Sequence, residues 1–270
     1  MSFVANARMY AVAPEAEAAW RDLLANICAE AGVALDYIAY PAPQPLEVLW
    51  RRPDLGCVHM CGFPIALHIA EVVPLAAPIP RAAWAAGRAV YRSDLIVRAD
   101  SAFHTLEDTF GGTVGWTVSH SHSGFNAPRH HLLRYRTPAR PTLYRAVRGD
   151  LVTARAVLDA VRDGSIDVGP LDAFWHMLIR KYRPEVTEGV RVLASTGTAP
   201  MPAFVASPNL PQRDVAALRG AFADAATRAW FAPFRAALLI DGFVPVTHET
   251  FAPTLAWHEE ALAAGYPTPA

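Results

Sequence analysis

The sequence predicts an α/β protein in which helices cover mostly parallel sheets. Short apolar runs rich in valine and isoleucine alternate with longer alanine-rich amphipathic runs along the whole chain, which is the pattern of this class. Proline and glycine separate the runs, as Pro14 and Gly32 do around the first amphipathic run. With 270 residues the chain has room for one large domain or two lobes, and we expect two lobes.

The first part of the chain predicts five strands and three helical segments. The longest helix is expected to begin at Pro14, because proline suits a first helical turn, and to stop at Gly32. Strands are expected over residues 6–12, 35–40, 55–60, 72–79 and 91–98. Helical segments are expected over residues 14–31 and 46–50 and in an acidic turn within 100–108.

The second part of the chain continues the alternation. Pro128 predicts a helix after Ser123-Gly124, so the serines before it would form the loop at its start. Strands or extended segments are expected over residues 111–118, 165–169, 190–195, 200–207 and 243–246. Helices are expected over residues 129–135, 152–162, 171–182, 212–230 and 250–263.

Composition and charge exclude several classes of protein. A net charge of −1 with 18% charged residues gives no electrostatic reason to bind nucleic acid or an anionic membrane surface. No run of about 18 apolar residues is present, so no direct membrane insertion is expected. The first ten residues have no basic and apolar signal pattern, which predicts a cytoplasmic chain unless a leader has been removed.

Motifs for cofactors, metals and nucleophilic catalysis are missing from the sequence. Neither a glycine-rich dinucleotide loop nor a phosphate-binding loop with its lysine occurs, and no Gly-x-Ser-x-Gly elbow follows a strand. Cys28, Cys57 and Cys61 lack the second ligand pair of a structural zinc site, so buried thiols are expected. We therefore predict no cofactor, no metal and no catalytic residue.

One segment, Ser-His-Ser-His-Ser-Gly, concentrates polar chemistry directly after a predicted strand. Ser119, Ser121 and Ser123 alternate with the histidines, so in an extended loop their hydroxyls share one side. Hydroxyls and free amides at a helix start favour a phosphate-like or carboxylate anion, and Gly124 allows a close backbone approach. The alternative is structural: Ser123 caps the helix and the other serines fill a turn.

The histidines of this segment leave two further alternatives. His120 and His122 share a face and so offer two metal ligands, but a metal requires more. His130 and His131 are adjacent on a helix and point about 100° apart, so they cannot both complete the site. His122 as a base beside Ser121 or Ser123 would make the protein an enzyme, which requires a hydrogen-bonded Ser–His pair.

In combination, several segments resemble the type II periplasmic binding proteins, in the phosphate, phosphite and phosphonate branch with transferrin-like topology. The resemblance is firm over about 90–200 and follows the order of elements elsewhere. Its strongest parts are the serine-rich loop before Gly124 and Pro128 and the Gly-Ser-Ile-Asp-Val-Gly-Pro-Leu-Asp turn about forty residues later. The segments that carry it are residues 91–97, 106–108, 115–117, 119–128, 161–172 and 195–196.

The resemblance implies a Venus flytrap of two α/β lobes joined by two crossover strands, with a ligand in the cleft between them. Residues 1–92 and 199–270 would form lobe one, and residues 93–198 lobe two. The function implied is a solute-binding protein that captures a small anionic or phosphonate-like ligand for an ABC permease. The resemblance also implies a monomer in the periplasm, and a cytoplasmic sensor or an enzyme on the same fold stays the alternative.

The resemblance also assigns ligand-binding residues. In such proteins the anion lies on the serine-rich loop, which implies Ser119, Ser121, Ser123 and the Gly124 backbone here, and His122 is added as a histidine that would line the pocket. His120 and His122 stand where small polar residues are expected, so plain phosphate is doubtful as the ligand and pH-sensitive binding is expected.

Four residues outside the loop complete the predicted ligand set. Tyr10 and Phe63 lie where lobe one should face the cleft, and Tyr91, like Trp116, offers a ring to stack on the ligand. Asp172 is either a helix cap or a partner for an ammonium group of the ligand.

Overall fold

The computed structural model describes residues 2–270, which group into two compact units. Unit 1 comprises the described residues up to Tyr91 together with Pro200–Ala252, and unit 2 comprises Arg92–Ala199 and Pro253–Ala270. The predicted lobes, residues 1–92 with 199–270 and residues 93–198, stay a prediction. The predicted lobe one also included residues 253–270, but this segment packs within unit 2, where its backbone accepts hydrogen bonds from Asn126 and Arg129.

Unit 1 is built on a six-stranded mixed sheet with the strand order β13-β4-β12-β3-β1-β2. Its strands are β1 (Phe3–Asn6), β2 (Leu35–Tyr37), β3 (Leu55–Met60), β4 (Val73–Pro80), β12 (Ala203–Ala206) and β13 (Ile240–Pro245), and the short β5 (Val90–Tyr91) lies outside the sheet. Its helices are α1 (Pro14–Ala31), α2 (Leu46–Trp50), α3 (Gly62–Ala66), α7 (Gln212–Asp224) and α8 (Ala232–Leu238).

The prediction of mostly parallel sheets is wrong for unit 1. β1 runs parallel to β2 and β3, but β12 inserts antiparallel between β3 and β4, and β13 is antiparallel to β4. β12 comes from a segment more than 120 residues after β4, so no local pattern could reveal its place. A strand that is buried on both faces has the same apolar sequence whether it pairs parallel or antiparallel to its neighbour, so the sequence does not reveal the direction.

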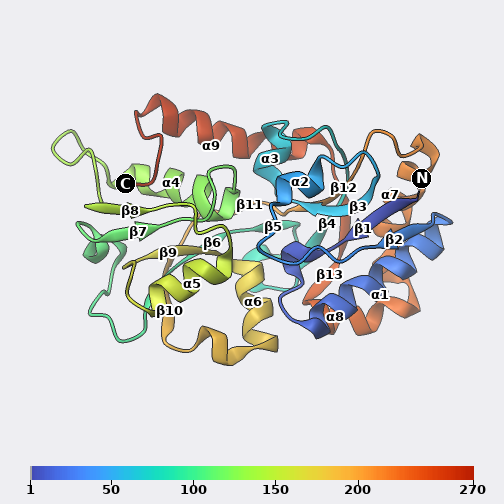
Figure 1. The fold of residues 1–270 in the computed structure, drawn as a ribbon, viewed down its shortest axis with the longest axis horizontal. Helices are drawn as coiled ribbons and strands as arrows, with labels where there is room; N and C mark the ends of the chain where they lie inside the picture. The colour runs from blue at the N-terminus through green and yellow to red at the C-terminus, as the bar shows by residue number, and fades with distance from the viewer. Residues whose placement is uncertain (1) are drawn as a thin grey trace. The chain divides into compact units, whose positions relative to one another are not determined.

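Aromatic packing fills the core of unit 1. Trp20 on α1 lies edge-on to His59 of β3, and Phe204 of β12 stacks on the same imidazole with ring centroids 3.7 Å apart. Phe222 of α7 stacks in turn on Phe204, with ring centroids 5.2 Å apart. Helix α1 packs with α7 and α8, as the blue and orange-red helices beside one another in Figure 1 show. Burial of these large rings removes apolar surface from water and thereby stabilises the unit.

Unit 2 has a smaller, wholly antiparallel sheet with the order β10-β6-β9 and a separate parallel pair of β7 and β8. Its strands are β6 (Ser93–Arg98), β7 (Thr113–Gly115), β8 (Ala146–Arg148), β9 (Gly169–Asp172) and β10 (Val190–Ser195), and β11 (Ala199–Pro200) spans the boundary. Its helices are α4 (Ala127–Leu132), α5 (Ala154–Arg162), α6 (Ala173–Tyr182) and α9 (Ala252–Ala263), which begins at the boundary residue Ala252.

Most predicted elements are present, with shifted ends. The helix over residues 14–31 is confirmed, and Gly32 ends it in the left-handed conformation at φ 65°. The predicted strand at 165–169 lies later, at Gly169–Asp172, because residues 163–165 form a turn in which Asp163 accepts hydrogen bonds from Ser165. The predicted helix over 212–230 is α7 followed by two 3-10 turns.

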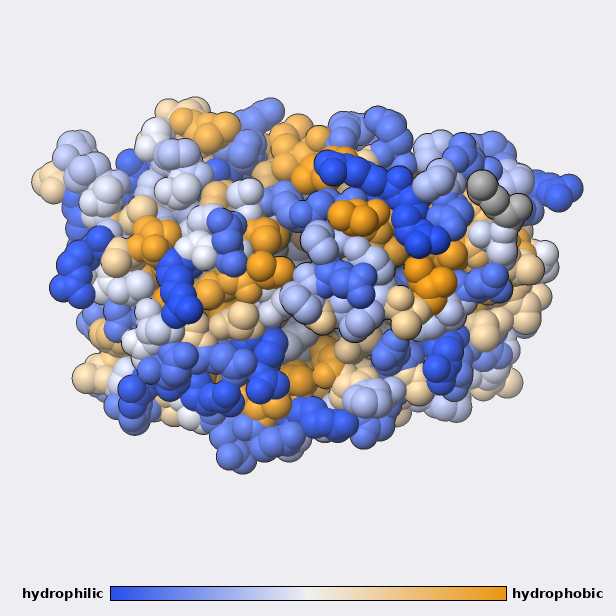
Figure 2. Space-filling model, in the orientation of Figure 1, coloured by the Kyte–Doolittle hydropathy of each residue, from blue (hydrophilic) through white to orange (hydrophobic). Residues whose placement is uncertain are grey.

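Two results for residues 2–270 concern membrane-spanning helices and metal sites. None of their helices has the length and apolarity needed to cross a membrane. Within the same residues no three His, Cys, Asp or Glu side chains gather as a metal site would require. Polar and apolar residues are interspersed on the face of the molecule drawn in Figure 2.

Candidate functional site

The predicted serine-rich segment forms a loop, residues 118–124, between β7 and the helix α4. It passes into a single π-helical turn, His122–Asn126, that continues directly into α4. The amide of Asn126 donates to the carbonyl of Ser121, and that of Ala127 to His122, both five residues back. Such π turns are rare and frequently occur at functional sites. We call residues 118–124 the serine loop.

Ser121 and Gly124 shape the start of this helix. The hydroxyl of Ser121 accepts a hydrogen bond from the amide of Gly124 at 3.0 Å, so Ser121 is the N-cap residue. A Cβ at position 124 would overlap Oγ1 of Thr117 and lie 2.9 Å from the Ser121 hydroxyl. Gly124 was predicted to make room for a ligand. In the structure the protein's own Thr117 fills that space, so the requirement for glycine is internal.

Ser123 occupies the position expected of a ligand-binding serine. Its carbonyl accepts a hydrogen bond from the hydroxyl of Ser93 at 2.8 Å, and its own side chain is half-buried. No hydrogen bond joins the Ser123 hydroxyl to any other group in residues 2–270, and Ser119 is exposed. The helix start therefore presents a hydroxyl at the positive end of the helix dipole.

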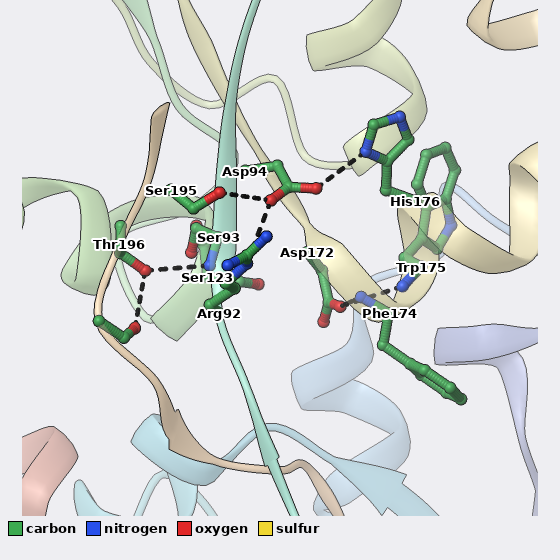
Figure 3. Close-up of polar contacts among 11 residues, drawn as sticks. Arg92, Ser93, Asp94, Ser123, Asp172, Phe174, Trp175, His176, Ser195 and Thr196 are labelled. Carbon is green, nitrogen blue, oxygen red and sulfur yellow. Dashed lines mark hydrogen bonds and ion pairs between the residues drawn. The ribbon is translucent and has the colours of Figure 1, made fainter. Parts of the chain in front are cut away.

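The ends of several strands surround the serine loop. In the register of the antiparallel sheet, Ser93 of β6 lies opposite Asp172 of β9, so both residues face the same side of the sheet. Thr196, just after β10, accepts a hydrogen bond from the Ser93 amide at 3.0 Å (Figure 3). The Ser93 hydroxyl reaches the serine loop, which places Asp172 on the face of the sheet that the loop covers.

Asp172 caps a helix, which is one of the two roles predicted for it from the sequence. Its Oδ1 accepts hydrogen bonds from the amides of Phe174 and Trp175 at 2.8 and 3.0 Å at the start of α6. Both cap hydrogen bonds go to Oδ1, so Oδ2 of the same carboxylate can make other interactions. The position on the loop side of the sheet keeps Asp172 a candidate for contact with a ligand.

A buried carboxylate, Asp94, lies on the other face of the same sheet. It accepts a hydrogen bond from the hydroxyl of Ser195 at 2.9 Å and pairs with Nδ1 of His176 at 3.0 Å (Figure 3). The guanidinium of Arg92 lies 3.5 Å from its Oδ1. Because Asp94 is only 7% exposed, these partners are required to offset the loss of hydration. The network joins β6, β10 and α6 beneath the serine loop.

His122 belongs to the interior of unit 2. It is 1% exposed, its Nδ1 lies 3.2 Å from the Asn126 amide, and its ring centroid is 5.3 Å from that of Trp257. Burial, reinforced by the neighbouring His130, lowers the pKa of His122 to about 3, so its imidazole is neutral at ordinary pH. These contacts are those of a packing residue, and we leave His122 out of the ligand set. The predicted pH-sensitive binding loses its basis at this residue.

Tyr10, Phe63 and Tyr91, the other predicted ligand residues, lie in unit 1 and are each 1% exposed. The Tyr10 carbonyl accepts a hydrogen bond from the Trp20 indole, and the Tyr91 hydroxyl lies 3.5 Å from the Cys61 sulfur. Phe63 is part of α3. The structure brings Ser121, Ser123 and Gly124 together, and the roles of these three aromatic residues stay predictions.

Sequence reasoning missed Ser93, Asp94 and Arg129 as parts of the site. Ser93 and Asp94 are two polar residues directly before the apolar run Leu95–Val97 of a strand, a signal that marks buried polar groups with a specific partner. Arg129 is a fully buried cation on α4, at 1% exposure. Two of its partners, His258 and Pro267, lie near the end of the chain, so no local pattern reveals its burial.

Comparison with known proteins identifies a family. The sequence model of the family described as ABC transporter, phosphonate, periplasmic substrate-binding protein matches residues 10–251. No curated protein matches the chain.

Solved structures with the same fold include a component of a phosphonate transporter and a protein bound to methylphosphonate. A binding-protein component of an ABC phosphonate transporter from Pseudomonas aeruginosa superposes with a TM-score of 0.79 at 18% identity, covering 98% of this chain and 88% of that one. PhnD1 from Prochlorococcus marinus, in complex with methylphosphonate, gives 0.76 at 13% identity, covering 97% and 98%. XAC2383 from Xanthomonas citri, bound to ATP, gives 0.66 at 20% identity, covering 98% of each chain. The chain thus has the fold of two-lobed type II periplasmic binding proteins, as predicted.

Proposed function

Because this chain belongs to the family of periplasmic substrate-binding proteins of phosphonate ABC transporters, we propose that its serine loop binds the phosphonate-type anion. Family membership makes it a solute-binding protein that serves a transporter. The proposal concerns where the ligand is bound and by which groups. The observation that carries it is the unpaired Ser123 hydroxyl at the start of an eleven-residue π/α helix, His122–Leu132, within the residues that the structure describes.

The chemistry of the loop suits a tetrahedral oxyanion. A helix start carries partial positive charge, and a hydroxyl that donates to an ionised oxygen forms a short, strong hydrogen bond. Ser93 holds the Ser123 carbonyl, and Ser121 holds the Gly124 amide, so the loop is fixed before the ligand arrives. Fixing the loop in advance reduces the entropy lost on binding. Ser119, Ser121 and Asp172 complete the polar set.

The enzyme alternative finds no support in the geometry of the loop. It required a hydrogen bond between His122 and a neighbouring serine. His122 is instead joined to Asn126, and Ser121 to the amide of Gly124. The family is one of transport proteins, which agrees with a binding function.

The family also indicates the partner and the compartment. Its members serve ABC transporters in the periplasm, so a small ligand and an ABC permease are the expected partners. We propose that this chain works in the periplasm and as a monomer. Analytical ultracentrifugation tests the second point, because a monomer of 29.3 kDa sediments as one species whose mass does not change with concentration.

Titration calorimetry of the whole chain tests the proposed ligand class. The panel is methylphosphonate, inorganic phosphate, methanesulfonate and acetate, and we expect the tightest binding for a phosphonate or phosphate. In Ser123→Ala the Kd should rise roughly 10- to 100-fold, because a hydrogen bond to a charged group contributes about 1.5–3 kcal/mol. The matched control is Ser101→Ala, in the turn after the opposite end of β6, where the hydroxyl donates to the Arg98 carbonyl.

The outcomes separate clearly. A folded wild-type protein that binds none of the four anions would refute the proposed ligand class. Binding that is unchanged in Ser123→Ala would place the ligand elsewhere.

A further inference from the structure

Arg129 is a buried cation without an acidic partner. It is 1% exposed, and no carboxylate lies within ion-pair distance of its guanidinium among residues 2–270. Its hydrogen-bond partners are neutral: Nη2 donates to Oδ1 of Asn126 at 2.8 Å and lies 2.7 Å from Nδ1 of His258, and Nη1 donates to the carbonyl of Pro267 at 2.9 Å. Buried charges are usually paired, so an unpaired one requires an explanation.

The surroundings of Arg129 confirm that its charge is not compensated. The guanidinium lies over the ring of Phe125 with its central carbon 4.9 Å from the ring centroid, and its Nε is buried with no hydrogen-bond partner in the described chain. Burial lowers the pKa of Arg129 to about 10, which leaves the group protonated at neutral pH. The positive charge is therefore permanent under ordinary conditions and poorly screened by solvent.

The place of Arg129 on the helix connects this charge to the serine loop. Arg129 follows Ser123 by six residues on the same continuous helix, a rise of about 9 Å. Its partner Asn126 belongs to the π turn and also donates to the carbonyl of Thr254, while His122 lies against Trp257. The C-terminal segment, residues 253–270, thus contacts both Arg129 and the π turn at the start of the helix.

We infer that Arg129 is an electrostatic positioning residue for the anion. Its guanidinium, kept without a carboxylate by Asn126, His258 and the carbonyl of Pro267, adds a full positive charge to the partial charge of the helix start. The inference rests on the proposed function, since it concerns the affinity of the serine loop for an anion. Arg129 acts through the field and does not touch the ligand, and its charge should lower the Kd roughly tenfold at that separation.

Two kinds of variant test the role of the charge. Arg129→Gln removes it, and Arg129→Lys keeps it while losing the forked hydrogen bonds. His258→Glu leaves Arg129 in place but gives it a carboxylate partner, and His258→Gln is the matched neutral control. Arg134→Gln removes an exposed arginine near the end of the same helical stretch and controls for net charge.

The measurements are the Kd for methylphosphonate at low and moderate ionic strength, together with the unfolding midpoint of each variant. We expect a roughly tenfold weaker Kd for Arg129→Gln and for His258→Glu, with near wild-type values for Arg129→Lys, His258→Gln and Arg134→Gln. If Arg129→Gln fails to fold, His258→Glu still tests the charge, because a new ion pair should not unfold the helix.

The outcomes distinguish this inference from the proposed function. A wild-type protein that binds no anion refutes the proposed function, and the inference with it. Wild-type binding that His258→Glu and Arg129→Gln leave unchanged refutes only the role of Arg129. Equal weakening in His258→Glu and His258→Gln would show that packing, and not charge, is responsible, and would overturn the inference.

Discussion

The two units bury different kinds of side chain. The core of unit 1 is dominated by rings such as Trp20, Phe204 and Phe222, and its buried His59 makes ring contacts and no side-chain hydrogen bond within the described residues. Unit 2 has a three-stranded sheet and holds most of the buried polar side chains, among them Asp94 and Arg129. The difference indicates that unit 1 gains its stability from apolar burial, whereas unit 2 uses part of its interior to position the serine loop.

The largest effect on stability is expected from the apolar core of unit 1. Phe204→Ala removes a fully buried ring that contacts His59 and Phe222, and should lower the free energy of unfolding by about 3–5 kcal/mol. Urea unfolding measures the loss. The Kd for methylphosphonate should change little at temperatures where the variant stays folded. A large change in Kd would show that the two units are not separate in function.

A somewhat smaller loss is expected from the polar interior of unit 2. Asp94→Ala leaves His176, Ser195 and Arg92 without their shared acceptor, and should lower the free energy of unfolding by about 3 kcal/mol. Asp100→Ala is the control, because its pair with Arg98 is exposed to solvent and its loss should change stability very little. Equal losses in the two variants would contradict a structural role for the Asp94 network.

Acid should destabilise both units through their buried histidines. Burial lowers the pKa of His59 and of His122 to about 3, and His130 adds to the effect at His122. The unfolded histidines take up protons below about pH 6.5, so the unfolded state binds more protons and stability falls as the pH drops from 6.5 towards 3. The slope approaches about 1.4 kcal/mol per pH unit for each histidine.

Single variants assign this slope to the two units. His59→Phe should reduce the pH slope at little cost, because the imidazole lies among aromatic rings. His122→Phe should reduce the slope equally but cost about 1 kcal/mol more, since it removes a partner of Asn126. Unfolding midpoints between pH 4.5 and 7.5 measure both. An unchanged slope in either variant would contradict the lowered pKa of that histidine.

The smallest effect is expected at Ser93. Ser93→Ala removes the hydrogen bond to the Ser123 carbonyl, at a cost of about 1 kcal/mol in stability and a several-fold rise in Kd. Ser195→Ala is the comparison in the same sheet, because the Ser195 hydroxyl donates a hydrogen bond to Asp94 on the other face. A Kd that rises in Ser195→Ala but not in Ser93→Ala would reverse the assignment of faces.

The sequence predicted the elements and the loop because these are local features. The helix Pro14–Ala31, bounded by Pro14 and Gly32, and the strands Leu55–Met60 and Val190–Ser195 were placed correctly from their own residues. The position of Ser121 and Ser123 at a helix start followed from Pro128 and the strand before them.

Features that depend on distant segments could not be predicted in the same way. The direction of β12 depends on strands far away in the chain. Asp94 meets His176 across 82 residues, and Arg129 meets Pro267 across 138. His122 was placed in the ligand set because the resemblance puts the anion on this loop, but the π turn directs its side chain inward to Asn126, which loop spacing alone does not reveal.

A crystal structure of the complex with methylphosphonate tests the central claim most directly. The account predicts phosphonate oxygens at hydrogen-bonding distance, about 2.6–3.0 Å, from the Ser123 hydroxyl and at the start of the helix that follows it. Bound methylphosphonate with every oxygen held by other residues, and the serine loop without a contact to it, would contradict the account.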